Sequence, residues 1–154
     1  MIVRKDQPPS DPGIDGRAER FGAFESLHYS DAGGLTQFGA YVETLQPGSR
    51  SSERHWHEQQ DEFLYLLAGE ATVVEEDGEY LLRPGDAACW PAGSANAHQV
   101  VNRSDAPCSY LIVGTRPTHD VVHYPDLGHT LYNDEDSTWR LLGSDGTLIK
   151  EGMA

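Results

Sequence analysis

The stretch His55-Trp56-His57-Glu58-Gln59-Gln60-Asp61-Glu62 holds the densest group of metal-binding side chains in the chain, and an apolar run follows it at 63–67. Alternate residues of a strand share a face, so the imidazoles of His55 and His57 point the same way, about 6–7 Å apart along the backbone. Glu62 lies five positions after His57, an odd offset that would place it on the opposite face of one continuous strand. The polar residues 58–61 therefore predict a bend, after which Glu62 begins a second strand and returns to the imidazoles.

Short strand-like segments separated by turn residues continue on both sides of this stretch. They span residues 21–29, 37–45, 62–67, 71–74, 79–82, 87–90, 98–102 and 108–114. No segment shows a helical stripe of ten or more residues. Regularly spaced short strands with turn signals between them predict an all-β sandwich or barrel. A length of 154 residues fits a single domain of this kind.

Two spaced groups of residues resemble the motifs of the cupin family. The pattern Gly48…His55-x-His57-x4-Glu62-x6-Gly69 is similar to the first cupin motif, and Gly85-x5-Pro91-x-Gly93…His98-x3-Asn102 is similar to the second. The resemblance covers roughly residues 47–102, and the strand pattern extends it to about Gly114. It implies a single-domain cupin barrel, also called a double-stranded β-helix or jelly roll. It also implies metal ligands at His55, His57, Glu62 and His98.

Three imidazoles and one carboxylate suit a borderline divalent metal, and we expect one ion per chain: Fe, Mn, Zn, Ni or Co. Both motifs depart from the usual spacing at a turn: six residues separate Gly48 from His55 where the pattern has five, and four separate Gly93 from His98 where it has two. By strict count Asn96 would hold the fourth ligand position, and its strand parity equals that of His98. We favour His98, since imidazole is the better ligand.

The chain divides by composition into three parts. Residues 1–20 form an N-terminal arm without periodicity, which we expect to be disordered or to lie across a neighbour. Residues 21–115 form the cupin β-barrel, and residues 116–154 form a C-terminal extension that packs on the barrel and ends in a hairpin around Asp145-Gly146. Within the extension, His123-Tyr124-Pro125-Asp126 could cover the barrel mouth, but a surface loop is the favoured interpretation.

Charge and cysteine usage exclude several classes of partner. Asp and Glu number 25 against 11 Lys and Arg, a formal charge of −14 that disfavours nucleic acid and anionic membranes. We expect a small-molecule ligand instead. The first residues lack the apolar run of a signal peptide, and Cys89 and Cys108 are expected to be buried thiols, so a cytoplasmic protein is predicted. The outward apolar side chains of Phe63, Tyr65 and Leu67 predict a homodimer.

A cupin fold does not determine the reaction, so several functions remain open. Tyr41 and Glu43 share a strand face that we expect to look into the barrel, which makes them the candidate catalytic residues. The favoured hypothesis is a metal-dependent isomerase or lyase, such as a sugar-phosphate isomerase, in which the metal acts as a Lewis acid on a small polar metabolite. An Fe(II) dioxygenase is one alternative. A non-catalytic cupin that binds a sugar or an organic acid is another.

Overall fold

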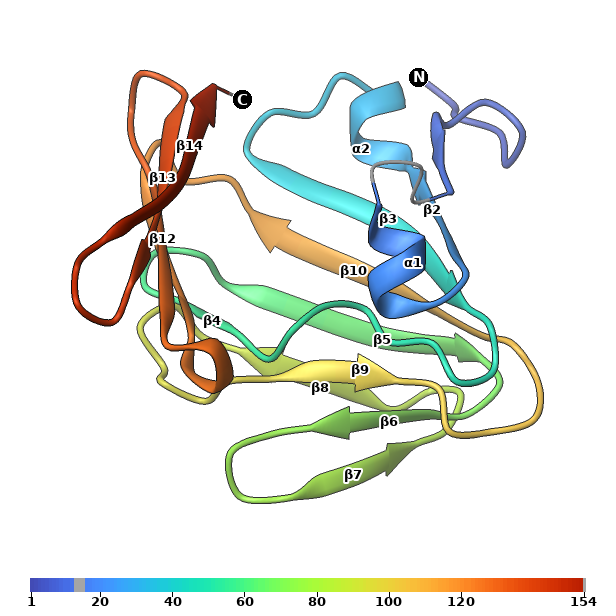
Figure 1. Ribbon diagram of the computed structural model, residues 1–154. Helices are drawn as coiled ribbons and strands as arrows, with labels where there is room; N and C mark the ends of the chain where they lie inside the picture. The colour runs from blue at the N-terminus through green and yellow to red at the C-terminus, as the bar shows by residue number, and fades with distance from the viewer. Residues whose placement is uncertain (13–15, 154) are drawn as a thin grey trace.

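The computed structural model describes residues 1–12 and 16–153, and its regular structure is mostly antiparallel strand (Figure 1). The largest sheet has six strands in the order β1 (Ser10–Asp11), β2 (Phe24–His28), β3 (Phe38–Leu45), β10 (Cys108–Thr115), β5 (Glu62–Ala68) and β8 (Ala87–Trp90). A second sheet holds β7 (Glu79–Leu82), β6 (Ala71–Val74) and β9 (Gln99–Val101). These two sheets form the barrel walls.

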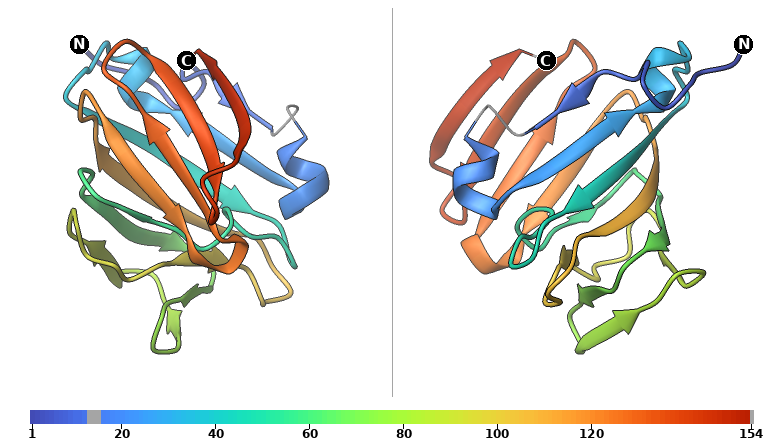
Figure 2. Two further views of the ribbon diagram at one scale, coloured as in Figure 1. Left: turned by 60° about the vertical axis from the view of Figure 1, so that its left-hand side comes forward. Right: turned by 90° about the vertical axis from the view of Figure 1, so that its right-hand side faces the viewer.

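A third sheet is built mainly from the C-terminal extension. Its order is β14 (Leu148–Met153), β13 (Thr138–Gly143), β12 (His129–Asn133), β11 (Asp120–Tyr124) and β4 (Trp56–His57). The helical elements are short: α1 (Arg17–Phe21), α2 (Tyr29–Ala32) and the 3-10 turn η1 (Pro125–Leu127). In Figure 2 the strands of the extension form a layer on the other side of the molecule from β2 and β3.

The core lies between the two barrel walls and follows the alternation of the strands. On β5, Leu64 and Leu66 are fully buried, while Phe63, Tyr65 and Leu67 face outward and are 37%, 39% and 46% exposed. This alternation agrees with the predicted separation of the two β5 faces. The all-β jelly-roll fold predicted for the chain is confirmed, and 71–74, 79–82 and 87–90 are strands with the predicted bounds.

Both ends of the chain contain strands that the sequence did not predict. In the predicted N-terminal arm, Ser10 and Asp11 pair with Leu27 and Ser26 of β2, so these two residues extend the largest sheet. The expectation that the arm is disordered or lies across a neighbour stays a prediction. The extension contains four strands and not one hairpin alone, although the hairpin at Asp145-Gly146 is confirmed between β13 and β14. His123 and Tyr124 end β11 and Pro125 begins η1, so the favoured surface loop is wrong.

The structure bears on three further expectations, which concern the cysteines, a homodimer and the membrane. Cys108 is buried but Cys89 is exposed, which corrects the expectation of two buried thiols; neither forms a disulfide. The homodimer stays a prediction, and the exposed row of Phe63, Tyr65 and Leu67 is its basis. Among the described residues, no helix has the length and apolar character needed to cross a bilayer.

Candidate metal centre

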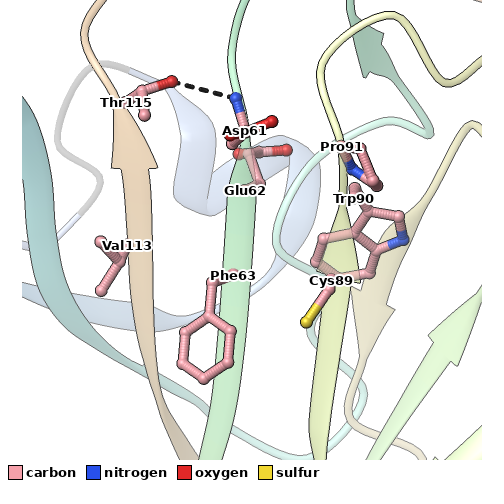
Figure 3. A pocket seen from close by; sticks show the side chains of 8 residues that line it. All are labelled: Asp61, Glu62, Phe63, Cys89, Trp90, Pro91, Val113 and Thr115. Carbon is pink, nitrogen blue, oxygen red and sulfur yellow. Dashed lines mark hydrogen bonds between the residues drawn. The ribbon is translucent and has the colours of Figure 1, made fainter.

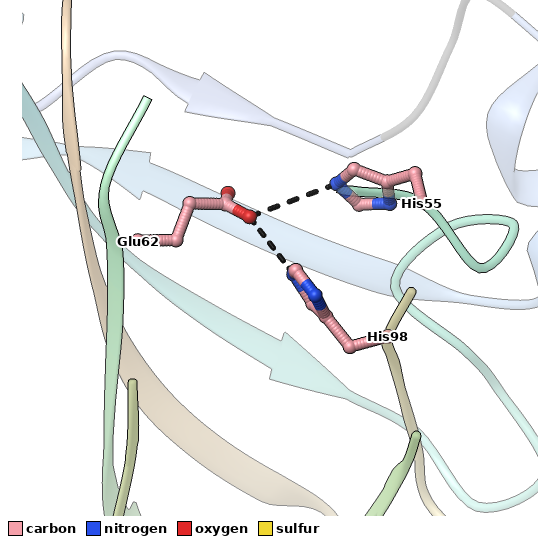
Figure 4. A group of neighbouring side chains, drawn as sticks. All are labelled: His55, Glu62 and His98. Atoms are coloured by element: carbon pink, nitrogen blue, oxygen red, sulfur yellow. Dashed lines mark hydrogen bonds and ion pairs between the residues drawn. The ribbon is translucent and has the colours of Figure 1, made fainter. Parts of the chain in front are cut away.

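Two neighbouring backbone segments bring the first and last predicted ligands together. His55 and His98 form an isolated antiparallel bridge, in which the His55 amide donates to the His98 carbonyl at 3.1 Å and the His98 amide donates back at 2.9 Å. Glu62 approaches from the first position of β5, after the bend that residues 58–61 provide (Figure 4). The predicted turn thus returns the carboxylate to the imidazoles.

Three side chains converge closely enough to hold one ion. Glu62 Oε2 lies 2.8 Å from His98 Nε2 and 3.8 Å from His55 Nε2. The three ligand atoms all lie within 4.8 Å of one another, and His98 is buried while the other two are half-buried. Two imidazole nitrogens and a carboxylate oxygen are a donor set that borderline divalent metals accept. The residues therefore fit the metal that the sequence predicts.

His57 lies at the edge of this compact group. Its Nε2 is 3.6 Å from Glu62 Oε2, and its ring meets that of His55 edge-on at a centroid distance of 5.1 Å. His57 does not belong to the group of His55, Glu62 and His98, whose ligand atoms all lie within 4.8 Å of one another. Its role as a fourth ligand stays a prediction.

All three imidazoles have an oxygen acceptor at Nδ1, which leaves Nε2 for the centre. His55 Nδ1 donates to the Glu53 carbonyl at 2.9 Å, and His98 Nδ1 donates to the Asn96 carbonyl at 3.1 Å. His57 Nδ1 donates to the Asp120 carboxylate at 2.5 Å. A proton held on Nδ1 is the arrangement that metal-binding histidines adopt, because the Nε2 lone pair can then coordinate the ion. His98 also bonds to Glu62 through Nε2, at 2.8 Å, so an ion bound there would displace that proton.

The structure also separates the two candidates for the last ligand position. His98 points at Glu62, and its ring stacks on Trp90 with centroids 3.7 Å apart and an interplanar angle of 6°. The side-chain oxygen of Asn96 accepts instead from the Glu76 amide at 3.1 Å. The choice of His98 over Asn96 therefore agrees with the geometry.

Burial and mutual charge set the protonation of the centre. Burial alone would raise the pKa of Glu62, but the hydrogen bond from His98 and the nearby imidazoles lower it to about 2. Burial lowers the pKa of His55 to about 4, only partly opposed by the Glu62 charge. At neutral pH the carboxylate is thus ionised and His55 is neutral, which are the forms that bind a cation.

Acidification should destabilise the metal-free protein in two overlapping steps. The folded state keeps His55 neutral, so its contribution is lost as the pH falls from its ordinary pKa of 6.5 to about 4. The folded state keeps Glu62 ionised, so its contribution is lost between about pH 4.5 and 2. We expect the first step to cost about 3 kcal/mol, measured by urea unfolding of chelator-treated protein. His55→Gln should flatten that step; an unchanged slope between pH 6.5 and 4 would contradict it.

A cavity of about 700 Å³ opens beside the centre. Glu62 and His57 line it, together with Tyr41 of β3 and residues of the turn between β12 and β13. A smaller hollow of about 360 Å³ lies by the exposed side chains Phe63 and Cys89 of the neighbouring strands β5 and β8 (Figure 3). The larger cavity is the better place for a ligand, because it joins the ligand group to further polar side chains.

The two candidate catalytic residues occupy different positions. Tyr41 lines the larger cavity, and its ring stacks on His28 at a centroid distance of 5.2 Å. Glu43 faces the barrel interior, as expected, and is only 5% exposed. Its carboxylate accepts from Tyr110 at 2.5 Å and from Ser26 at 2.8 Å, and burial raises its pKa. The catalytic roles of both stay predictions.

Two residues of the extension border the centre: Asp120, which sequence reasoning missed, and Tyr124, which it placed in a surface loop. Asp120 bonds to His57, and the Tyr124 ring lies 5.8 Å from that of His55. Arg54 secures the same segment through a double hydrogen bond to Asp126, at 2.6 and 2.9 Å. The available signal for a strand here was composition: Val121, Val122 and Tyr124 are β-branched or aromatic, and Pro125 ends the run.

Comparisons with known proteins find a matching family model and similar structures. The sequence model of the Cupin domain family matches residues 41–114. A crystal structure of a sugar phosphate isomerase from a cupin superfamily, from Silicibacter pomeroyi, is 34% identical, covers 97% of both chains and has a TM-score of 0.86. A structure from Acidithiobacillus ferrooxidans, named as a candidate sugar phosphate isomerase, is 30% identical, covers 83% of this chain and 81% of the other and has a TM-score of 0.76. Protein SchB of Streptomyces halstedii is 30% identical over 138 residues, 90% of each chain.

Proposed function

Since this chain belongs to the cupin family, we propose that it is a metal-dependent enzyme of isomerase or lyase type that acts on a small polar metabolite. The observation that carries the proposal is the converging group of His55, Glu62 and His98 beside a cavity large enough for a metabolite. The names of the Silicibacter and Acidithiobacillus proteins support a carbohydrate-like substrate with a carbonyl group.

The proposed roles follow from the position of each side chain. His55, Glu62 and His98 would hold the ion, with His57 as the predicted fourth ligand. A divalent ion at this place supplies Lewis acidity toward a carbonyl or hydroxyl oxygen. Burial raises the pKa of Tyr41, so its phenol stays protonated and can donate a hydrogen bond to a ligand oxygen in the cavity.

Glu43 fits a less direct role than the base that the sequence predicts. It is absent from the cavity wall, and both of its oxygens already accept hydrogen bonds from Tyr110 and Ser26. We therefore propose that Glu43 organises the buried side chains beneath the cavity and does not itself touch the ligand.

Proton exchange in deuterated water tests this function directly. The protein is loaded in turn with Mn²⁺, Zn²⁺, Ni²⁺, Co²⁺ and, under anaerobic conditions, Fe²⁺. Each form is incubated with aldoses, ketoses and their phosphates. Proton NMR then follows exchange of the hydrogen on the carbon next to the carbonyl group. Metal-dependent exchange or isomer formation is expected. Metal-loaded protein that binds sugars without exchange would instead indicate a binding module, and substrate-dependent oxygen uptake with Fe²⁺ would indicate a dioxygenase.

Tyr41→Phe should reduce turnover in that assay by roughly 100-fold while the metal content stays unchanged, because the phenol would donate to the reacting oxygen. The matched control is Tyr65→Phe, which removes a hydroxyl from the outward face of β5, where Tyr65 is 39% exposed. The control should retain full activity. Equal activity of the two variants would remove Tyr41 from the proposed mechanism.

A further inference from the structure

We propose that Asp120, which the C-terminal extension supplies, is a positioning residue that sets the tautomer and ring orientation of His57 in the metal centre. The inference rests on the metal centre of the proposed function, but it concerns a residue outside the predicted ligand set. Asp120 lies 63 positions after His57 in the chain and outside residues 41–114, which match the Cupin domain.

Both carboxylate oxygens of Asp120 accept hydrogen bonds from the segment that carries His57. One carboxylate oxygen accepts from His57 Nδ1 at 2.5 Å, and the other accepts from the Gln59 amide at 2.9 Å. The residue is 5% exposed, so solvent competes little for either oxygen. One side chain therefore fixes both the imidazole of His57 and the backbone two residues further on, where the bend toward Glu62 begins.

Strand pairing holds Asp120 in place independently of the metal. Val122 of β11 pairs with His57 of β4, and the Glu58 amide donates to the Val121 carbonyl at 3.0 Å. The carboxylate thus approaches from a regular strand, where its position is determined by the backbone register. The extension does more than cover the barrel, since it carries a contact to a predicted ligand.

His57 differs from the other two imidazoles in where its acceptor comes from. His55 and His98 each donate from Nδ1 to the carbonyl two residues before them, Glu53 and Asn96, so neighbouring backbone sets the orientation of these two rings. His57 uses a distant carboxylate. A carboxylate that accepts from Nδ1–H keeps the Nε2 lone pair free and raises the basicity of the ring, both of which strengthen metal coordination.

The test is Asp120→Asn, which keeps the size of the side chain. The new amide can donate to Nδ1 and so favour the tautomer with the proton on Nε2. In that tautomer Nε2 has no free lone pair with which to coordinate a metal. We expect the affinity for Co²⁺ and Zn²⁺, measured by competition with a chelator, to fall by roughly 10- to 100-fold. Asp126→Asn is the control, because Asp126 lies in the same extension but bonds to Arg54; its metal affinity should equal that of the unchanged protein.

Nitrogen-15 NMR of the metal-free protein separates a positioning role from a structural one. His57 should carry its proton on Nδ1 in the unchanged protein and lose that preference in Asp120→Asn. The measurement on the unchanged protein tests the tautomer by itself, so it decides the question even if the variant is unstable. A proton on Nε2 in the unchanged protein, or equal metal affinity in a folded Asp120→Asn, would overturn the inference. Absence of metal binding by the unchanged protein would instead overturn the proposed function, and the tautomer measurement would still decide the role of Asp120.

Discussion

Glu62→Gln should abolish stoichiometric binding of a divalent metal. Glu62 supplies the one carboxylate of the compact ligand group, and its Oε2 lies within 4 Å of imidazole nitrogens of His55, His57 and His98. Glutamine keeps the shape but removes the negative charge that a cation needs in a site of low exposure. We expect the affinity to fall on the order of 1000-fold, measured by calorimetric titration with Zn²⁺ and by elemental analysis after dialysis.

Glu58→Gln provides the matched control for this experiment. Glu58 lies in the same polar stretch and also bonds to an imidazole, but its partner is His123, at 2.8 Å, and not a ligand of the centre. The change removes the same charge from the chain and should leave the metal affinity within about twofold. Retention of one ion at native affinity by Glu62→Gln would exclude Glu62 from the ligand set.

Gly69→Ala should cost at least about 3 kcal/mol of folding free energy, the largest stability effect that we predict for a single methyl group. Gly69 joins β5 to β6 with a φ of +76°, and a Cβ built there would lie 2.5 Å from the Pro107 carbonyl oxygen and 2.8 Å from the Cys108 Cα. Both contacts are with backbone at the start of β10, so no side chain can rotate away. Thermal unfolding should show a midpoint lowered by roughly 6–12 °C.

Gly48→Ala separates backbone strain from collision. Gly48 has a similar φ of +81°, but a Cβ there would meet no atom within 4 Å. Its substitution should therefore cost only the left-handed conformation, about 1–2 kcal/mol. Equal destabilisation by the two variants would show that the approach of Gly69 to Pro107 carries no energy of its own.

The barrel strands could be predicted from the sequence because turn residues mark their ends. Pro84-Gly85 and Pro91-Ala92-Gly93 bracket the run that forms β8, and the apolar run after Glu62 forms β5, which pairs with β8 in the same sheet. Proline and glycine act over two or three residues, so this information is local. The convergence of His55, Glu62 and His98 was also accessible, since it followed from strand parity, one bend and the family resemblance.

The contribution of the extension could not be predicted in the same way. Asp120 reaches His57 through pairing of β11 with β4, and β4 is a strand of only two residues. Such a pairing leaves no periodic pattern to recognise, and residues 116–154 lie beyond the motif spacing. The N-terminal residues Ser10–Asp11 were missed for the same reason, because their order depends on β2 and not on their own composition.

The stacking of His98 on Trp90 would give this protein an optical reporter of the proposed metal centre. The Trp90 indole is 5% exposed and donates from Nε1 to Glu75 at 2.7 Å, so its surroundings are fixed. The other two tryptophans have other neighbours: Trp56 stacks on His123, and Lys150 lies over the Trp139 ring. Because the ring centroids of His98, a predicted ligand, and Trp90 lie 3.7 Å apart, a paramagnetic ion bound to His98 would quench the emission of that indole at short range. Fluorescence lifetimes of the unmodified protein should therefore change when the proposed centre binds such an ion, and Trp56, which stands between His55 and His57 in the chain, should contribute to that change.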